Sequence, residues 1–455
     1  VNGPIEVNIY GEKGLLETRW AEPGATELYV KTPYADIKKV EIDRNNDIPE
    51  LNRQNNLWVK DQVFNKLEPL RFEFLTGDHQ KDQTAIFWTP MIGGNAYDGF
   101  MAGLTVHNIG LAPKKFTYLV SPMLSTSRRL RPVGMAEFSY QILPTKAFEL
   151  IRIGTSVKSF GLDKDIHNAQ YFAVSPYLHF NLGSRTVRKP LHQEVLVQGI
   201  SNSGTFANSN SRDLGFFAQY TMNFKKPAYL LNWTSRYEYY NSKVIFGEFS
   251  RTEQISRIWT NLNQTFSYSI GKMDRKLELN VFGGYTLNYQ NFNPFGLNQQ
   301  LDRMFWSING LQGNQDLFLE DYNFGRSATT GFWSQQRMDR HGQFHTANSA
   351  GSNSHWLTTA TLYAQLPIKP NIFGVFADFG LAPSSGILEP TQSIDHFYNA
   401  GLAIRMGKVF GIYFPLIYGN SYYTGQLFTN YAQNIRFSLR INIVNRLSLH
   451  TLLNS

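Results

Sequence analysis

The chain has 455 residues, no cysteine, and 43 Lys+Arg against 35 Asp+Glu, which gives a net charge of +8. The absence of cysteine excludes a disulfide framework and thiolate chemistry. The positive charges are spread along the chain, so a solvated surface or anionic lipid headgroups explain them as well as nucleic acid would, and we expect no nucleic acid partner. Aromatic residues reach 15% while charged residues are only 17%, a balance typical of a barrel with aromatic girdles at two membrane interfaces.

The sequence contains no apolar run of about 18 residues that would form a transmembrane helix. A chain of this kind that spans a membrane must do so as a closed barrel, because only a closed sheet otherwise satisfies its backbone in lipid. The chain begins at Val1 without a signal-peptide pattern, so we expect a mature form or a fragment.

Residues 1–66 are rich in Glu, Asp and Lys and contain short strand candidates separated by Gly, Pro and Asn. About 60 residues form only a marginal core. We interpret this part as a small periplasmic β-sandwich module or the end of a larger domain, followed by a linker at 67–83.

From residue 84 the pattern changes to successive strands with a two-residue period. It predicts an all-β fold, a sixteen-stranded antiparallel transmembrane β-barrel over 84–444, followed by a C-terminal tail at 445–455. The expected strands are 84–92, 97–109, 115–125, 133–143, 147–160, 169–183, 193–203, 212–224, 228–240, 255–270, 276–290, 355–368, 372–382, 397–407, 409–419 and 434–444. The segment 241–254 is interpreted as a loop, and a strand at KVIFGEF is the alternative.

Connections of alternating length join these strands. Those at 144–146, 225–227 and 369–371 are short, whereas those at 241–254, 383–396 and 420–433 are long, and the longest is 291–354. Outer-membrane barrels place their short turns in the periplasm. An even number of strands then places both termini on the periplasmic side of the outer membrane.

The strand NIFGVFADFG at 371–380 carries one carboxylate, Asp378, on an otherwise apolar or small strand. We expect Asp378 to face the lumen, as we do Arg405, Arg436 and Arg440, which lie on the polar faces of later strands. Our hypothesis is that the loop 291–354 folds back into the lumen and that Arg326 pairs with Asp378 as a latch between lid and barrel. The alternative is that the arginines of the loop are surface charges and Asp378 meets lumen water.

No motif in the chain indicates catalysis or a cofactor. His341 and His345 have the i, i+4 spacing of a zinc helix, but the Glu of that motif is missing and Gly342 lies between them. We therefore interpret them as parts of a polar surface loop and predict no catalytic residue and no metal site.

The order of a long loop, HWLTTATLYAQLPI, GVFADFG, FYNAGLAIRM, IYFPLIYG and IRFSLRINI resembles the last strands of the BamA-like superfamily of outer-membrane insertases and two-partner transporters. The resemblance implies a lid motif in the sixth loop and an acidic residue on a following strand. Asp378 matches the acidic position. The lid motif departs from the family, because Phe324-Gly325-Arg326 stands where Arg-Gly-aromatic is expected.

The segments DIPELNRQNN, FLTGDHQKDQTAIFWTPMIGGNAYDGFMAGLTVHN and KKFTYLVSPMLSTSRRLRPVGMAEFSY resemble the C-terminal part of large Bacteroidota proteins similar to zinc aminopeptidases (gluzincins) fused to a barrel. The resemblance implies that any zinc site lies in a domain upstream of these residues. The first of three functions is our main expectation, and the other two are alternatives. The three functions are a barrel that anchors a periplasmic peptidase-like domain or serves in an outer-membrane complex, a BamA-like machine for insertion or translocation, and a membrane-anchored zinc aminopeptidase. The expected partners are outer-membrane lipid and other outer-membrane or periplasmic proteins.

Overall fold

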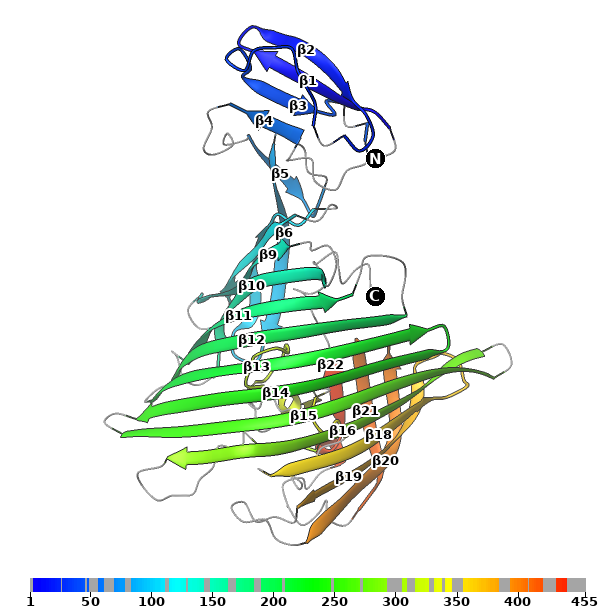
Figure 1. Cartoon of the computed structure of the whole chain (residues 1–455). Helices are drawn as coiled ribbons and strands as arrows, with labels where there is room; N and C mark the ends of the chain where they lie inside the picture. The colour runs from blue at the N-terminus through cyan, green and yellow to red at the C-terminus, as the bar shows by residue number, and fades with distance from the viewer. Residues whose placement is uncertain are drawn as a thin grey trace. The chain divides into compact units, whose positions relative to one another are not determined.

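The computed structural model is almost entirely β-sheet (Figure 1). None of the helices in the described part of the chain has the length and apolar character needed to cross a membrane. The structure describes all residues except 1–2, 26, 46, 49–55, 61–68, 78–82, 111–113, 128–129, 143–147, 163–168, 184–189, 207–208, 247–248, 271–272, 293–304, 309–315, 327–330, 338–339, 346–354, 384–392, 408, 420–430 and 440–455.

The chain divides into two compact units, which are described separately here. One unit contains Val1–Met91, Leu104–Ser121 and Val444–Ser455, and the other contains Ile92–Gly103 and Pro122–Ile443.

The first unit contains a small antiparallel sheet with the strand order β2-β1-β3-β4. Alternating apolar residues bury one face of β1, where Val7 and Ile9 are both buried. The four strands form one sheet at the position where we expected a small β-sandwich module or the end of a larger domain. Its strands are β1 (Ile5–Gly11), β2 (Gly14–Ala21), β3 (Lys39–Ile42) and β4 (Leu57–Val59).

The expected linker at 67–83 contains a strand that sequence reasoning missed. This strand, β5 (Leu70–Phe74), pairs in parallel with Thr84 to Trp88 of the next strand. Its five residues, LRFEF, do alternate, but a run this short between turn residues gives a weak signal.

The remaining strands have the order of an antiparallel β-barrel. Sixteen of them correspond one to one to the sixteen strands expected from the sequence, which confirms the predicted fold class. They are β6 (Thr84–Asn95), β7 (Gly99–His107), β8 (Phe116–Ser125), β9 (Pro132–Ile142), β10 (Phe148–Gly161), β11 (Gln170–Leu182), β12 (Leu191–Phe206), β13 (Ser209–Lys226), β14 (Tyr229–Phe246), β15 (Phe249–Ile270), β16 (Met273–Phe292), β18 (Trp356–Gln365), β19 (Phe373–Pro383), β20 (Ile394–Met406), β21 (Phe410–Tyr418) and β22 (Arg436–Leu439).

The segment 241–254 is not the loop that we expected from its sequence. β14 continues to Phe246 and β15 begins at Phe249, so the two strands pair almost to their ends. The backbone ladder continues without a register shift from Asn241↔Gln254 to Ile245↔Ser250, although the side chains of this stretch do not alternate between apolar and polar. The alternative of a separate strand at KVIFGEF also differs from the structure, because Lys243–Phe246 belong to the end of β14 and Phe249 to the start of β15.

The two faces of the barrel sheet differ in chemistry, as β19 shows. Phe376 and Asp378 lie on the buried face, whereas Val375 and Phe379 lie exposed on the other. Charged side chains on β14 and β15, including Arg236, also lie on the buried face. On β19 the outward positions are thus apolar and the carboxylate lies on the inward face, as in a barrel that faces lipid.

Candidate functional site

The candidate functional site is the connection between β16 and β18, which we call the lumen loop. Its described pieces are residues 305–308, 316–326, 331–337 and 340–345. These pieces contact the inward face of the barrel strands. In Figure 1 they are the yellow loop segments enclosed by the barrel strands. This placement agrees with the expectation that the loop folds back into the lumen.

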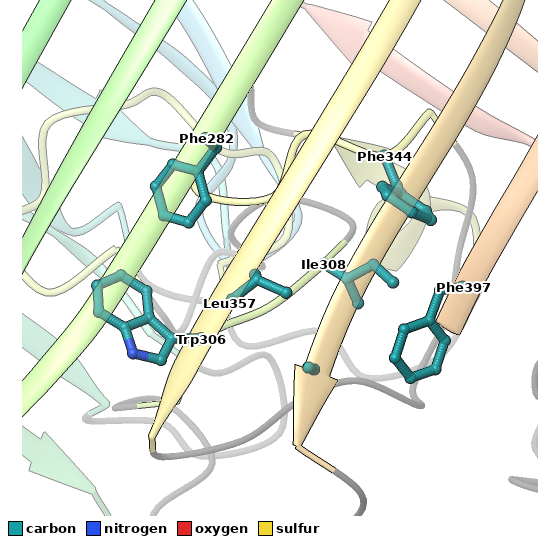
Figure 2. Packing of buried hydrophobic residues seen from close by; sticks show 7 residues of the cluster. Phe282, Trp306, Ile308, Phe344, Leu357 and Phe397 are labelled. Carbon is teal, nitrogen blue, oxygen red and sulfur yellow. The ribbon is translucent and has the colours of Figure 1, made fainter. Parts of the chain in front are cut away.

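An apolar cluster fixes one part of the lumen loop to the wall (Figure 2). Full burial of a side chain such as Phe344 stabilises the docked loop by about 1.5–3 kcal/mol relative to exposure. The indole N–H of Trp306 also donates to Oγ1 of Thr286 at 3.0 Å, so its polar atom is satisfied. The cluster contains Trp306, Ile308 and Phe344 from the loop, Phe282 from β16, Leu357 from β18, Ala382 from β19 and Phe397 from β20.

Glycines give this cluster its close packing. A Cβ atom at Gly284 would lie 2.9 Å from ring atoms of both Phe282 and Trp306, and a Cβ atom at Gly342 would overlap the backbone of Ile308. Gly284 on β16 therefore makes room for the loop's tryptophan, Trp306.

Buried carboxylates and arginines hold the next part of the lumen loop together. Asp316 accepts the backbone N–H groups of Glu320 at 3.1 Å and Asp321 at 3.0 Å, and it pairs with Arg326 at 3.2 Å. Arg340 pairs with Glu320 at 2.6 Å and with Asp321 at 2.8 Å. Burial alone would raise the pKa of the Asp316 carboxyl, but Arg326 and Arg340 outweigh it and lower the pKa below its ordinary value.

This loop network continues into the wall strands β14 and β15. Arg236 lies 2.8 Å from Glu320 of the loop and 2.7 Å from Glu238 on its own strand. Glu238 in turn pairs with Arg257 of β15 at 2.6 Å. Each buried charge named here therefore has an opposite charge within ion-pair distance, which is the condition for burying it.

Further polar contacts tie the same region to β10 and to Trp306. Lys158 of β10 donates from Nζ to the backbone carbonyl of Leu319 at 2.5 Å. The guanidinium of Arg257 lies 4.9 Å from the ring centroid of Trp306, within the range of a cation–π interaction. Arg257, on the inner face of β15, thus contacts both the ion-pair network and the apolar cluster.

Asp378 fixes the other end of the loop to β19. Its carboxylate accepts the backbone N–H of His345 at 2.7 Å and lies 2.7 Å from His345 Nδ1. The imidazole ring packs against Phe376 and Tyr413, each with ring centroids 4.8 Å apart. Burial lowers the pKa of His345, and the nearby Asp378 opposes that shift without cancelling it.

A short strand of the lumen loop also pairs with β22. Gln336 and Arg337 form β17 (Gln336–Arg337), which runs parallel to Phe437 and Ser438. The ring of Phe332 stacks on Phe437 with centroids 4.7 Å apart and an interplanar angle of 10°. This part of the loop therefore extends the edge of β22 as well as filling space.

The structure does not bring Arg326 and Asp378 together, so the expected latch between them is corrected. Arg326 pairs with Asp316 within the loop, and Asp378 binds His345. The sequence indicated that a cation of the loop and a carboxylate of the wall both lie in the lumen. It could not show whether Arg326 binds Asp378 or Asp316, and Asp316 lies only ten residues before Arg326 on the same loop.

The other expected lumen residues have defined positions, with one exception. Arg405 of β20 pairs with Glu278 of β16 at 2.8 Å and lies 4.1 Å from the ring centroid of Tyr363. Arg436 donates to the backbone carbonyl of Ser334 in the lumen loop. Both contacts lie on the inward side of the sheet. Arg440 lies outside the described residues.

His341 and His345 are buried, so the expectation of a polar surface loop is wrong for them. His341 lies among Trp259, Phe282 and Trp306, with ring centroids 4.9–6.4 Å away. Burial lowers the pKa of His341 well below its ordinary value. The two histidines thus face different partners.

Sequence reasoning missed Arg236, Glu238 and Arg257 as members of the site. A signal existed, since all three occupy the inward, alternating positions of strands 228–240 and 255–270. Three charges at inward positions of neighbouring strands indicate a charged partner inside a barrel.

The fold and the loop define the chain as a sixteen-stranded β-barrel whose lumen contains the connection between its eleventh and twelfth strands, β16 and β18. No protein-family model matches the sequence, and no curated protein matches it. Among solved structures, CdiB from Acinetobacter baumannii is similar at 11% identity and a TM-score of 0.33, with 76% of this chain and 60% of that chain covered. CdiB from Escherichia coli is similar at 11% identity and a TM-score of 0.31, with 76% and 63% covered. The chain spans about three fifths of the length of these two proteins. Similarity at this level is too low to support an inference about function.

Proposed function

We propose that the chain is an outer-membrane β-barrel that moves polypeptides across or into the outer membrane, and that the lumen loop closes it at rest. The observation that carries this proposal is the attachment of one loop to separate parts of the wall. Glu320 binds Arg236 of β14, and His345 binds Asp378 of β19. A loop held at both places obstructs the lumen and leaves only when these contacts break.

The outward face of β13 and β14 supports the membrane placement. Phe224 and Tyr229 lie near one end of the strands, with ring centroids 6.4 Å apart, and Phe216 and Tyr239 lie further along, with centroids 5.7 Å apart. The ten residues from Tyr229 to Tyr239 span about 34 Å along the strand, or about 26 Å along the membrane normal at a tilt of about 40°. This height matches the apolar band of about 25 Å that outer-membrane barrels present to lipid.

The polypeptide cargo is the finer part of the proposal. It is supported by the resemblance of residues 355–444 to the BamA-like insertases and two-partner transporters, and by the inward acidic residue Asp378 that this resemblance implies. Depletion of the protein, followed by measurement of outer-membrane protein levels and of secreted polypeptides, tests this part.

Conductance in a planar bilayer tests the closed lumen. The variant Glu320→Gln/Asp378→Asn weakens the loop's attachment to both β14 and β19. We expect the wild-type barrel to stay mostly closed and this variant to open more often and to a larger current. The matched control is Glu278→Gln, which removes the partner of Arg405 between two wall strands and leaves the lumen loop attached. Equal conductance of the wild type and the double variant would overturn the proposal.

A second candidate function is that of an anchor for a periplasmic domain. It is favoured by the four-stranded N-terminal sheet, which has its own buried residues Val7 and Ile9. Deletion of residues 1–66 from the full protein should then leave conductance unchanged but release specific periplasmic proteins from the outer-membrane fraction. The resemblance to zinc aminopeptidases remains a prediction about residues upstream of those described.

A further inference from the structure

A row of four outward side chains crosses the strands β12 to β15. The strand register aligns Ser203 with Arg212, Arg212 with Lys243, and Lys243 with Thr252. Two cations therefore stand directly opposite each other on neighbouring strands, with a hydroxyl group on each side. We call these four residues the basic row.

The basic row points away from the lumen. Asp213 and Ser242, the next residues along β13 and β14, are buried and hydrogen bonded to each other at 2.6 Å on the inward face. Because side chains alternate along a strand, Arg212 and Lys243 occupy the opposite face, and both are exposed.

Within the described part of the chain, no carboxylate neutralises the charges of the basic row. Like charges directly opposite on neighbouring strands are destabilising. Neither Arg212 nor Lys243 has an ion-pair partner among the residues that the structure describes. The described outward positions one row to either side on these strands are uncharged, namely Ser201, Leu214, Asn241 and Gln254 on one side and Asn210, Ile245 and Ser250 on the other.

The position of the row along the strands indicates what surrounds it. Arg212 and Lys243 lie four residues beyond Phe216 and Tyr239, which is about 13 Å along the strand and about 10 Å along the normal. The polar headgroup layer extends about 5–8 Å beyond the hydrocarbon core, so the basic row lies at its outer edge. β13 and β14 are joined at 227–228, at the ends opposite the basic row. Because β14, β15 and β16 alternate in direction, the basic row lies on the same side as the end of β16, where the lumen loop begins.

We propose that the basic row binds the phosphate groups of an anionic glycolipid in the outer leaflet. A guanidinium offers a fork of donors to a phosphate, and the Lys243 ammonium adds a second positive charge. The hydroxyls of Ser203 and Thr252 add hydrogen bonds to the phosphate or the sugar. A bound phosphate also removes the repulsion between Arg212 and Lys243. The proposal rests on the outer-membrane placement given above.

Lipid retention by purified protein tests the basic row. The full chain is placed in nanodiscs of neutral phosphatidylcholine doped with diphosphorylated lipid A, and bound lipid A is counted by native mass spectrometry. We expect the variant R212Q/K243Q to retain at least fivefold less lipid A than the wild type. The matched control, K225Q/K226Q, removes two charges at the opposite ends of the same strands and should retain as much as the wild type.

Three results would overturn the basic row as a phosphate site. They are equal retention by R212Q/K243Q and wild type, an equal loss in K225Q/K226Q, and equal retention of lipid A whose phosphates have been removed. Heat-modifiable migration on gels checks that each variant is a folded barrel. The proposed function and the phosphate site can fail independently. A barrel that opens as proposed but retains lipid A regardless of its phosphates overturns only the phosphate site. Recovery of the chain outside the outer-membrane fraction overturns the proposed function.

Discussion

Nδ1 of His345 in the lumen loop lies 2.7 Å from Oδ1 of Asp378 on β19, and the backbone N–H of His345 donates to the second carboxylate oxygen, also at 2.7 Å. One wall carboxylate thus fixes both the side chain and the backbone of the loop. Arg236 of β14 holds the loop elsewhere through Glu320. The loop is therefore attached to wall strands that are distant in sequence.

Removal of the Asp378 carboxylate should loosen the loop at β19. Asp378→Ala leaves the buried N–H of His345 without its acceptor, so we expect a loss of about 1–3 kcal/mol in the free energy of loop docking. Limited proteolysis of the loop in the folded barrel measures the effect. Asp378→Asn keeps an acceptor oxygen and should cost less, and equal rates of cleavage for the two variants would contradict this explanation.

The ion pair between Arg236 and Glu320 should show strong coupling. Arg236→Met leaves Glu320 and Glu238 each with only one arginine, and we expect a destabilisation of about 3 kcal/mol. A double-mutant cycle with Glu320→Gln should give a coupling energy of about 1–3 kcal/mol in denaturation experiments. The cycle of Arg236→Met with Glu278→Gln serves as the control, and its effects should add.

Lower pH should release the loop in two steps. Burial lowers the folded-state pKa of His341 and His345 below the unfolded value of about 6.5, so their contribution to docking is complete above that pH and is lost as the pH falls. For Asp316 and Glu320, burial raises the pKa but nearby arginines lower it further, so their contribution is complete above about pH 4 and is lost below it.

Conductance between pH 7.5 and pH 3 measures both steps. The variant His341→Phe/His345→Gln should lose the upper step and keep the lower one, because the carboxylates are unchanged. An upper step of normal size in this variant would exclude the histidines as its cause.

Two adjacent glycines offer a matched pair of substitutions. Gly284→Ala places a Cβ atom 2.9 Å from rings of Phe282 and Trp306, whereas Gly283→Ala meets only a methyl of Thr260 at 4.0 Å. We expect Gly284→Ala to cost about 1–3 kcal/mol and to change tryptophan fluorescence, with little effect of Gly283→Ala. Similar stability of the two variants would show that the cluster yields to the added methyl.

The absence of cysteine makes the orientation of the N-terminal module directly testable. Tyr29→Cys introduces a single thiol at a side chain that is 85% exposed. If the module is periplasmic, a membrane-impermeant maleimide should label this thiol only after the outer membrane has been permeabilised. Labelling of intact cells would place the module outside.

The barrel strands could be read from the sequence because each carries its own signal. Strands such as 276–290 and 372–382 alternate over their whole length, and burial on one face follows from that alternation. β5 was missed because it is short, and the β14–β15 hairpin was cut too early because its polar end resembles a loop. The partners of Asp378 and Arg326 could not be derived, since they depend on where a long loop lies within a closed wall.

The contacts of the lumen loop join residues that are far apart along the chain. Lys158 reaches Leu319, Arg236 reaches Glu320, and Arg436 reaches Ser334. Contacts between residues far apart in sequence form slowly. The chain must lose conformational entropy before such a contact contributes favourable energy. The loop can dock only after the strands before and after it have formed, so during biogenesis the barrel passes through a stage in which its interior is filled with water.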